Sequence, residues 1–140
     1  EVLPRFDQPH VTFVGCVGTE EKRPLLRDAR ALLMPITWDE PFGLVMIEAM
    51  LSGCPVVAYP RGSVPELVED GVTGFVVRDA EEMTDVVRPG GPLDRFDRAR
   101  CRERAVERFG RDRMVEEHLS LYRRVLLEPR SPRRAAVDAA

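Results

Sequence analysis

Four short runs of apolar and β-branched residues recur along the chain, at positions 11–14, 31–36, 55–59 and 74–77. Each run has the length and composition of a β-strand. The residues within a run are mostly apolar instead of alternating with polar ones, which indicates strands buried on both faces. The pattern therefore predicts a parallel sheet that helices cover on both sides.

Helical patterns lie between these runs, at positions 19–31, 42–52 and 63–69. An alternation of strand and helix is typical of an α/β fold with a parallel sheet. Ser63 and Glu66 have the spacing of a helix capping box, which predicts a structural role for both at the start of the third helix.

Three further helices are expected after the last strand, at 79–87, 94–109 and 111–127, with Gly110 ending the second of them. The apolar residues of the last two helices have the spacing of one helical face, so we expect them to form a buried stripe. This stripe consists of Phe109, Met114, Leu119, Tyr122, Val125 and Leu126.

The length of 140 residues fits one domain, which we place at 1–128, and positions 129–140 are expected to form a flexible tail. No run is apolar for long enough to cross a membrane, and the first residues lack the order of a signal peptide, so we expect a cytoplasmic protein. The arginines after position 88 are interleaved with acids, which favours a solvated helix over a nucleic-acid surface.

Three cysteines and two histidines stand far apart in the sequence, so neither a disulfide framework nor a metal site is expected. We interpret Cys16, Cys54 and Cys101 as reduced thiols that fill space.

The segment 35–59 carries the candidate chemistry. Pro41 suits the first position of a helix, which places Glu40 at or beside the N-cap. The backbone N–H groups of Phe42, Gly43 and Leu44 would then point out of the helix start, where the macrodipole favours an anion. The sequence therefore predicts a phosphate site at this turn.

Glu48 is an isolated carboxylate in a helix that is otherwise apolar from 42 to 51. A buried carboxylate without a partner is costly, so Glu48 needs one. It lies about one turn beyond Leu44, a distance that suits the ribose of a nucleotide, and Glu40 would hold hydroxyls of a sugar. Taken singly, Glu40 can also be a helix-start charge and Glu48 a solvent-facing one.

Together these residues resemble retaining glycosyltransferase family 4, whose signature is two glutamates separated by seven residues, here Glu40 and Glu48. The resemblance extends through 11–15, 53–58 and 61–75, and covers about residues 11–127. It implies a Rossmann-like domain, the C-terminal half of a GT-B fold, that lacks its first strands.

The resemblance also implies roles for individual residues. Glu40 is the catalytic-site glutamate that binds the donor sugar, and Glu48 binds the ribose. The backbone at Phe42, Gly43 and Leu44 binds the sugar and diphosphate, and Val17 and Lys22 are candidates for holding the base. The family uses no metal and no cofactor, and the donor is a UDP- or GDP-sugar.

The family pattern includes strands and a cationic clamp that precede position 11, as well as an N-terminal domain that binds the acceptor. We therefore expect a truncated chain that is inactive alone and whose partner is the missing domain of the same enzyme. The absent strands would leave a gap in the sheet, which predicts either a homodimer through that gap or a displaced 11–14 strand. The alternative is a non-catalytic module for nucleotide-sugar binding or assembly, and a GT-B epimerase or phosphorylase is a weaker one.

Overall fold

Three short parallel strands form the sheet in this computed structural model, which describes residues 8–127 of the chain. The strands are β1 (Leu32–Met34), β2 (Val56–Ala58) and β3 (Gly74–Val76), in that spatial order. The register places Leu33 opposite Val57, and Val57 opposite Phe75. Each strand lies within a run predicted from the sequence, so the α/β, Rossmann-like fold class is confirmed.

Helices alternate with these strands along the chain. They are α1 (Thr19–Asp28), α2 (Leu44–Leu51), α3 (Val64–Leu67), α4 (Ala80–Val87), the 3₁₀ helix η2 (Pro92–Arg95), α5 (Arg98–Phe109) and α6 (Arg111–Leu127). Asp79 starts α4 as an N-cap, because its side chain accepts a hydrogen bond from the Glu82 amide. The chain divides into two compact units between Val106 and Glu107, and each is described by itself.

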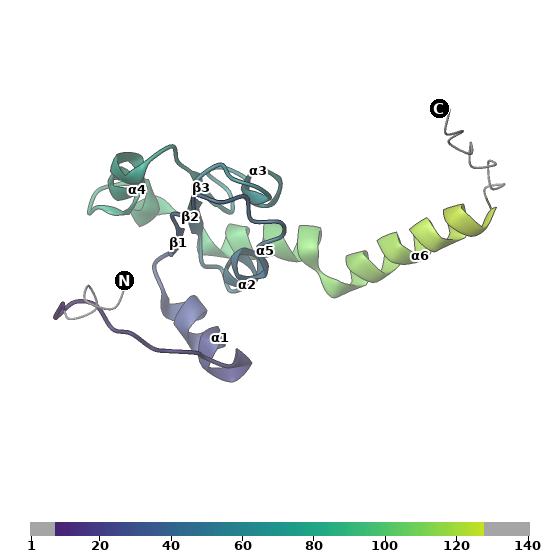
Figure 1. Ribbon diagram of the computed structural model, residues 1–140, viewed down its shortest axis with the longest axis horizontal. Coiled ribbons are helices and arrows are strands. Elements are labelled where there is room, and N and C mark those ends of the chain that lie inside the picture. The colour runs from purple at the N-terminus through teal and green to yellow at the C-terminus, as the bar shows by residue number, and fades with distance from the viewer. Residues whose placement is uncertain (1–7, 128–140) are drawn as a thin grey trace, which may run out of the picture. The chain divides into compact units, whose positions relative to one another are not determined.

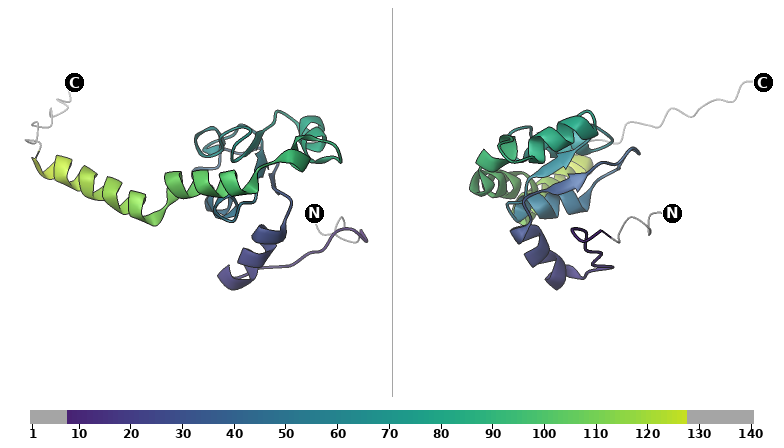
Figure 2. Two further views of the ribbon diagram at one scale, coloured as in Figure 1. Left: turned by 180° about the vertical axis from the view of Figure 1, so that it is seen from behind. Right: turned by 90° about the vertical axis from the view of Figure 1, so that its left-hand side faces the viewer.

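The first unit has a helix layer on each face of its sheet, with α4 on one side and α2 and α5 on the other (Figure 1). Val57 packs with Met83, Val86 and Leu93 of α4 and η2. Because side chains alternate along a strand, Val56 and Ala58 face the opposite layer. Figure 2 shows the same two layers from behind and from the side. Covering both faces explains why β2 consists of fully buried apolar residues.

The predicted strand at 11–14 is wrong, because this segment forms no strand in the described part of the chain. Its side chains are exposed, with Phe13 at 66% and Val14 at 54%. An extended segment is stable as a strand only with partners in a sheet. The described sheet therefore ends at β1, which is an edge strand.

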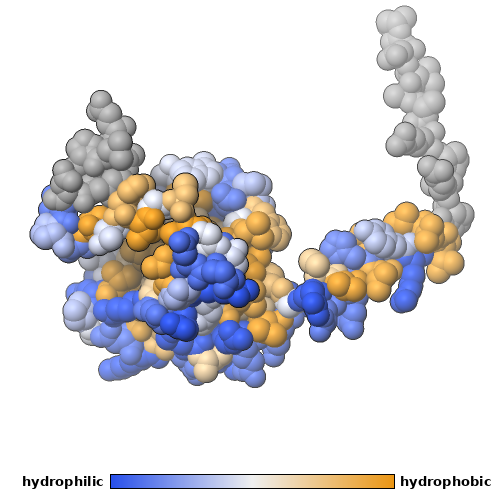
Figure 3. Space-filling model, turned by 90° about the horizontal axis from the view of Figure 1, so that it is seen from below, coloured by the Kyte–Doolittle hydropathy of each residue, from blue (hydrophilic) through white to orange (hydrophobic). Residues whose placement is uncertain are grey.

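The predicted buried stripe of the last helices is also wrong. In the second unit no described residue of α6 is buried, and Met114, Leu119, Tyr122, Val125 and Leu126 are 46% to 82% exposed. Phe109 is half-buried, with the Arg108 guanidinium above its ring. Hydrophobic surface accordingly runs along α6 (Figure 3). Helical spacing shows which residues share a face, but it does not supply a second layer to cover that face.

No helix among residues 8–127 combines the length and the apolar composition that a membrane crossing requires. The expected tail at 129–140 lies outside the described residues.

Candidate functional site

Residues 40–43 form the turn that precedes α2, which is called the Glu40 turn below. This turn follows the carboxyl end of β1, at the edge of the sheet where ligands of open α/β folds bind. The Glu40 carboxylate accepts a hydrogen bond from the Gly43 amide at 3.1 Å through Oε1. Its Oε2 accepts one from the Trp38 indole at 3.5 Å. Glu40 is thus half-buried and bound to its own turn.

The expected helix start at Pro41 is wrong, since α2 begins at Leu44. Gly43 is the N-cap of α2 and has a φ of 77°, in the left-handed region. Residues with a Cβ atom disfavour this conformation, and it interrupts a right-handed helix. The Gly43 amide is already engaged by Glu40. The amides that open the helix are therefore those of Leu44 and Val45, one to two residues later than predicted.

The loop after β2 supports this turn through three contacts that the sequence analysis missed. The Ser63 amide donates to the Glu40 carbonyl at 2.8 Å, and the Ser63 hydroxyl donates to the Phe42 carbonyl at 3.0 Å. The Gly62 amide donates to Asp39 Oδ1 at 3.2 Å. The two loops follow neighbouring parallel strands, so their carboxyl ends bring them to one edge of the sheet.

The capping-box interpretation of Ser63 is therefore wrong, because the side-chain hydrogen bond that defines a capping box is absent. Ser63 does precede α3, but its side chain makes no cap hydrogen bond and instead holds the Glu40 turn. The signal for this role was the glycine and serine in the loop that follows a strand, although their partner could not be read from the sequence.

Glu48 is half-buried in α2, and its partner is Lys22 of α1. The Lys22 Nζ lies 2.6 Å from Glu48 Oε1, and the two side chains are 29% and 38% exposed. The partner that the sequence analysis required for this carboxylate is thus supplied by the chain itself. Lys22 and Glu48 were separate candidates, and the structure brings them together.

A pocket of about 700 Å³ opens beside this ion pair between α1, α2 and α5. Its wall includes Lys22, Arg23, Arg27, Glu48, Leu51 and Arg102. Val17 does not line this pocket and lies instead on a separate hollow with Val14 and Leu25. The structure therefore brings together the ribose and base candidates Glu48 and Lys22, but it separates Val17 from them.

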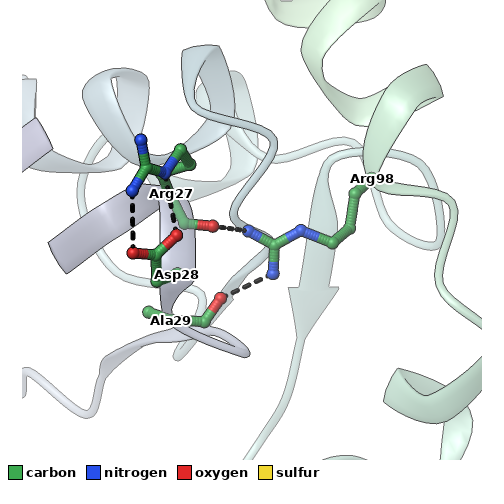
Figure 4. Close-up of polar contacts among 4 residues, drawn as sticks. All are labelled: Arg27, Asp28, Ala29 and Arg98. Carbon is green, nitrogen blue, oxygen red and sulfur yellow. Dashed lines mark hydrogen bonds and ion pairs between the residues drawn. The ribbon is translucent and has the colours of Figure 1, made fainter. Parts of the chain in front are cut away.

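Arg98 holds the C-terminal end of α1, the helix that carries Lys22 (Figure 4). Its guanidinium donates to the Ala29 carbonyl at 2.5 Å and to the Arg27 carbonyl at 2.6 Å. Arg27 itself pairs with Asp28, and this hydrogen bond lowers the pKa of the Asp28 carboxyl. The last carbonyls of a helix have no partner within the helix, and the macrodipole favours a cation beside them. Arg98 supplies both the hydrogen-bond donors and the positive charge.

The cysteines are all free thiols, and two of them fill space in the core. Cys54 and Cys101 are buried, whereas Cys16 is exposed, which corrects the expectation for that residue. Among the described residues, no three side chains of the metal-binding types converge on one point.

A parallel α/β sheet of Rossmann type, with a glutamate in the turn between the first strand and α2, places this chain in the class of Rossmann-like α/β proteins. Residues 2–88 match the family described as glycosyl transferases group 1, and the chain belongs to that family.

Three similar proteins are each longer than this chain. An uncharacterized 41.2 kDa protein in the cps region of Klebsiella pneumoniae is 32% identical over 127 residues, which cover 88% of this chain and 35% of that one. Sucrose-phosphate synthase from Thermosynechococcus elongatus has a TM-score of 0.72 and 31% identity, covering 83% of this chain and 30% of that one. HepE of Anabaena in complex with UDP-glucose has a TM-score of 0.64 and 28% identity, with coverage of 81% and 33%. The chain thus spans about a third of the length of these proteins.

Proposed function

We propose that this chain is the donor-binding part of a retaining glycosyltransferase of family 4, and that its donor is a UDP- or GDP-hexose. The observation that carries the proposal is the Glu40 turn at the start of α2, followed eight residues later by Glu48 on the wall of a pocket. Membership of the glycosyl transferases group 1 family and the UDP-glucose complex of a structural neighbour support it.

The diphosphate is assigned to the first turn of α2. The amides of Leu44 and Val45 open this helix, and the backbone of Phe42 and Gly43 forms the turn in front of it. Amides and macrodipole together favour an anion at such a position. Charge that develops on the leaving diphosphate is stabilised there, so the proposed reaction needs no metal ion.

The two glutamates hold the rest of the donor. Glu48 accepts hydrogen bonds from the ribose hydroxyls in the pocket beside α1. Glu40 orients the transferred sugar, for which it must exchange part of its present bonding to Gly43 and Trp38 for sugar hydroxyls. The sugar keeps its anomeric configuration, and its transition state is oxocarbenium-like.

We further propose that this chain alone binds the donor without transferring the sugar. It spans about a third of the length of the similar proteins, and the acceptor is assigned to the remaining part. Incubation of the chain with UDP-glucose and GDP-mannose should release no free sugar above the buffer rate. Donor cleavage by the chain alone would contradict this part of the proposal.

Binding is tested with calorimetry and with the fluorescence of Trp38, the one tryptophan of the sequence, whose indole contacts Glu40. UDP, GDP and their sugars are titrated against the wild-type protein, Glu48→Ala, and Glu103→Ala on the exposed side of α5 as the matched control. We expect Glu48→Ala to weaken binding at least about tenfold and Glu103→Ala to leave it unchanged, because a lost hydrogen bond to a charged group has this size. If no nucleotide gives heat or a fluorescence change, the proposed function is wrong.

A further inference from the structure

Lys22 differs from the neighbouring cations of α1 in the partner that it binds. Arg23 pairs with Glu20 and Arg27 pairs with Asp28, so both contact acids of their own helix. The Lys22 ammonium instead reaches α2 and contacts Glu48 Oε1 at 2.6 Å, across 26 positions of the sequence. The ion pair therefore joins two elements that line one pocket.

An ion pair this exposed contributes little to folding by itself, since water screens both charges. The balance changes when a ligand covers it. A carboxylate that loses its water under a ligand is costly unless a counter-charge and hydrogen bonds satisfy it. Lys22 supplies that counter-charge through Oε1, and the geometry of the carboxylate leaves Oε2 to accept from a ligand hydroxyl.

We propose that Lys22 is a positioning residue for the ribose: it fixes the Glu48 carboxylate so that the site distinguishes a ribonucleotide from a 2′-deoxyribonucleotide. This inference rests on the proposed function, because it assigns the ribose to Glu48. An oriented carboxylate rejects an analogue that lacks the hydroxyl, since the acceptor is then left unsatisfied. Without Lys22 the carboxylate rotates among several conformations and loses most of this discrimination.

The test compares the dissociation constants of UDP and 2′-deoxy-UDP for the full chain. The wild-type protein should prefer UDP at least about tenfold. Lys22→Met should bind UDP about tenfold more weakly and 2′-deoxy-UDP unchanged, so that the preference falls to about one. Lys22→Arg should keep most of the preference, because a guanidinium also pairs with a carboxylate. Arg100→Met, an exposed cation on α5, controls for the loss of one positive charge.

Two further variants separate this inference from the proposed function. Glu48→Gln keeps the shape of the side chain and should lose the preference to the same degree as Lys22→Met, and the double variant should be no worse than either. A structural role of Lys22 would lower the melting temperature and change the affinities of both nucleotides equally. If Lys22→Met retains the preference while Glu48→Gln loses it, the inference is wrong and the proposed function stands. If the wild-type protein binds neither nucleotide or shows no preference, the ribose assignment fails, and the inference fails with it.

Discussion

Gly62 lies in the loop that follows β2, against the backbone of the loop that follows β1. Its φ is 51°, and a Cβ atom there would lie 2.3 Å from the Glu40 carbonyl oxygen and 2.4 Å from the Glu40 amide nitrogen. Both atoms belong to the backbone and cannot move aside as a flexible side chain can. The position of the Glu40 turn therefore depends on a residue in the next loop.

We predict that Gly62→Ala lowers the free energy of unfolding by about 2 kcal/mol and weakens donor binding as well. Gly71→Ala is the matched control, because Gly71 has a φ of 73° but nothing within 4 Å of the added Cβ. That variant should lose only about 1 kcal/mol from backbone strain and bind the donor normally. Denaturant unfolding and Trp38 fluorescence measure the two effects, and equal losses in both variants would contradict the predicted role of Gly62.

The buried thiols offer a second prediction for single residues. Burial raises the pKa of the Cys101 thiol to about 12, with a further rise from the neighbouring Cys54, whose own pKa burial also raises. Because the thiolate is the form that reacts, Cys101 should react very slowly at pH 8. We expect iodoacetamide to label Cys16 in the folded protein and all three cysteines after denaturation, as mass spectrometry would show. Rapid labelling of Cys101 at pH 8 in the folded protein would contradict the burial.

The raised pKa of Cys101 also makes the contribution of this thiol to the free energy of unfolding depend on pH. The folded state holds the Cys101 thiol proton more tightly than the unfolded state does. The stability that this thiol contributes is therefore complete below the ordinary pKa of a thiol. It is lost as the pH rises from there towards about 12.

At the scale of elements, Arg98 of α5 holds α1 and thereby keeps Lys22 beside Glu48. Its two hydrogen bonds reach carbonyls at the C-terminal end of α1 (Figure 4). Helix packing alone is modest here, because only Leu26 of α1 is buried. The orientation of α1 therefore depends on these polar contacts as well as on packing.

We predict that Arg98→Met lowers the free energy of unfolding by about 2 kcal/mol, since it removes two charge-assisted hydrogen bonds and leaves two carbonyls unsatisfied. Arg100→Met, an exposed neighbour on the same helix, should cost less than about 0.5 kcal/mol. Denaturant unfolding gives both values, and amide exchange in α1 should rise in Arg98→Met only. An equal loss in both variants would mean that α1 is held by other contacts.

At the scale of the whole molecule, β1 is an unpaired edge of the described sheet. Leu33 in the middle of this strand is 46% exposed, and the predicted strand at 11–14 does not cover it. An uncovered edge is a template for pairing with another chain. The homodimer expected from the sequence stays a prediction.

We expect light scattering after size-exclusion chromatography to show concentration-dependent association of this chain. Leu33→Lys should reduce it, because a charge on an edge strand opposes pairing. The alternative is association through the exposed apolar residues of α6. Leu126→Lys tests it, since this residue of the second unit is 82% exposed. If only Leu126→Lys prevents association, α6 is the contact and the predicted edge pairing is wrong.

From residue 19 to residue 127 the sequence by itself determined the order of strands and helices, because continuous apolar runs and helical spacing are local properties of the chain. It also provided the candidates Glu40 and Glu48, because Glu40 stands beside Pro41 at an expected helix start and Glu48 is an isolated carboxylate in an otherwise apolar helix. Only the tertiary structure decided their partners. The contacts of Lys22 with Glu48 and of Ser63 with the Glu40 turn join residues more than twenty positions apart, and no local pattern encodes which distant groups meet. The same reason explains the two failures at 11–14 and in α6, where a local pattern predicted burial but burial requires a covering layer from elsewhere.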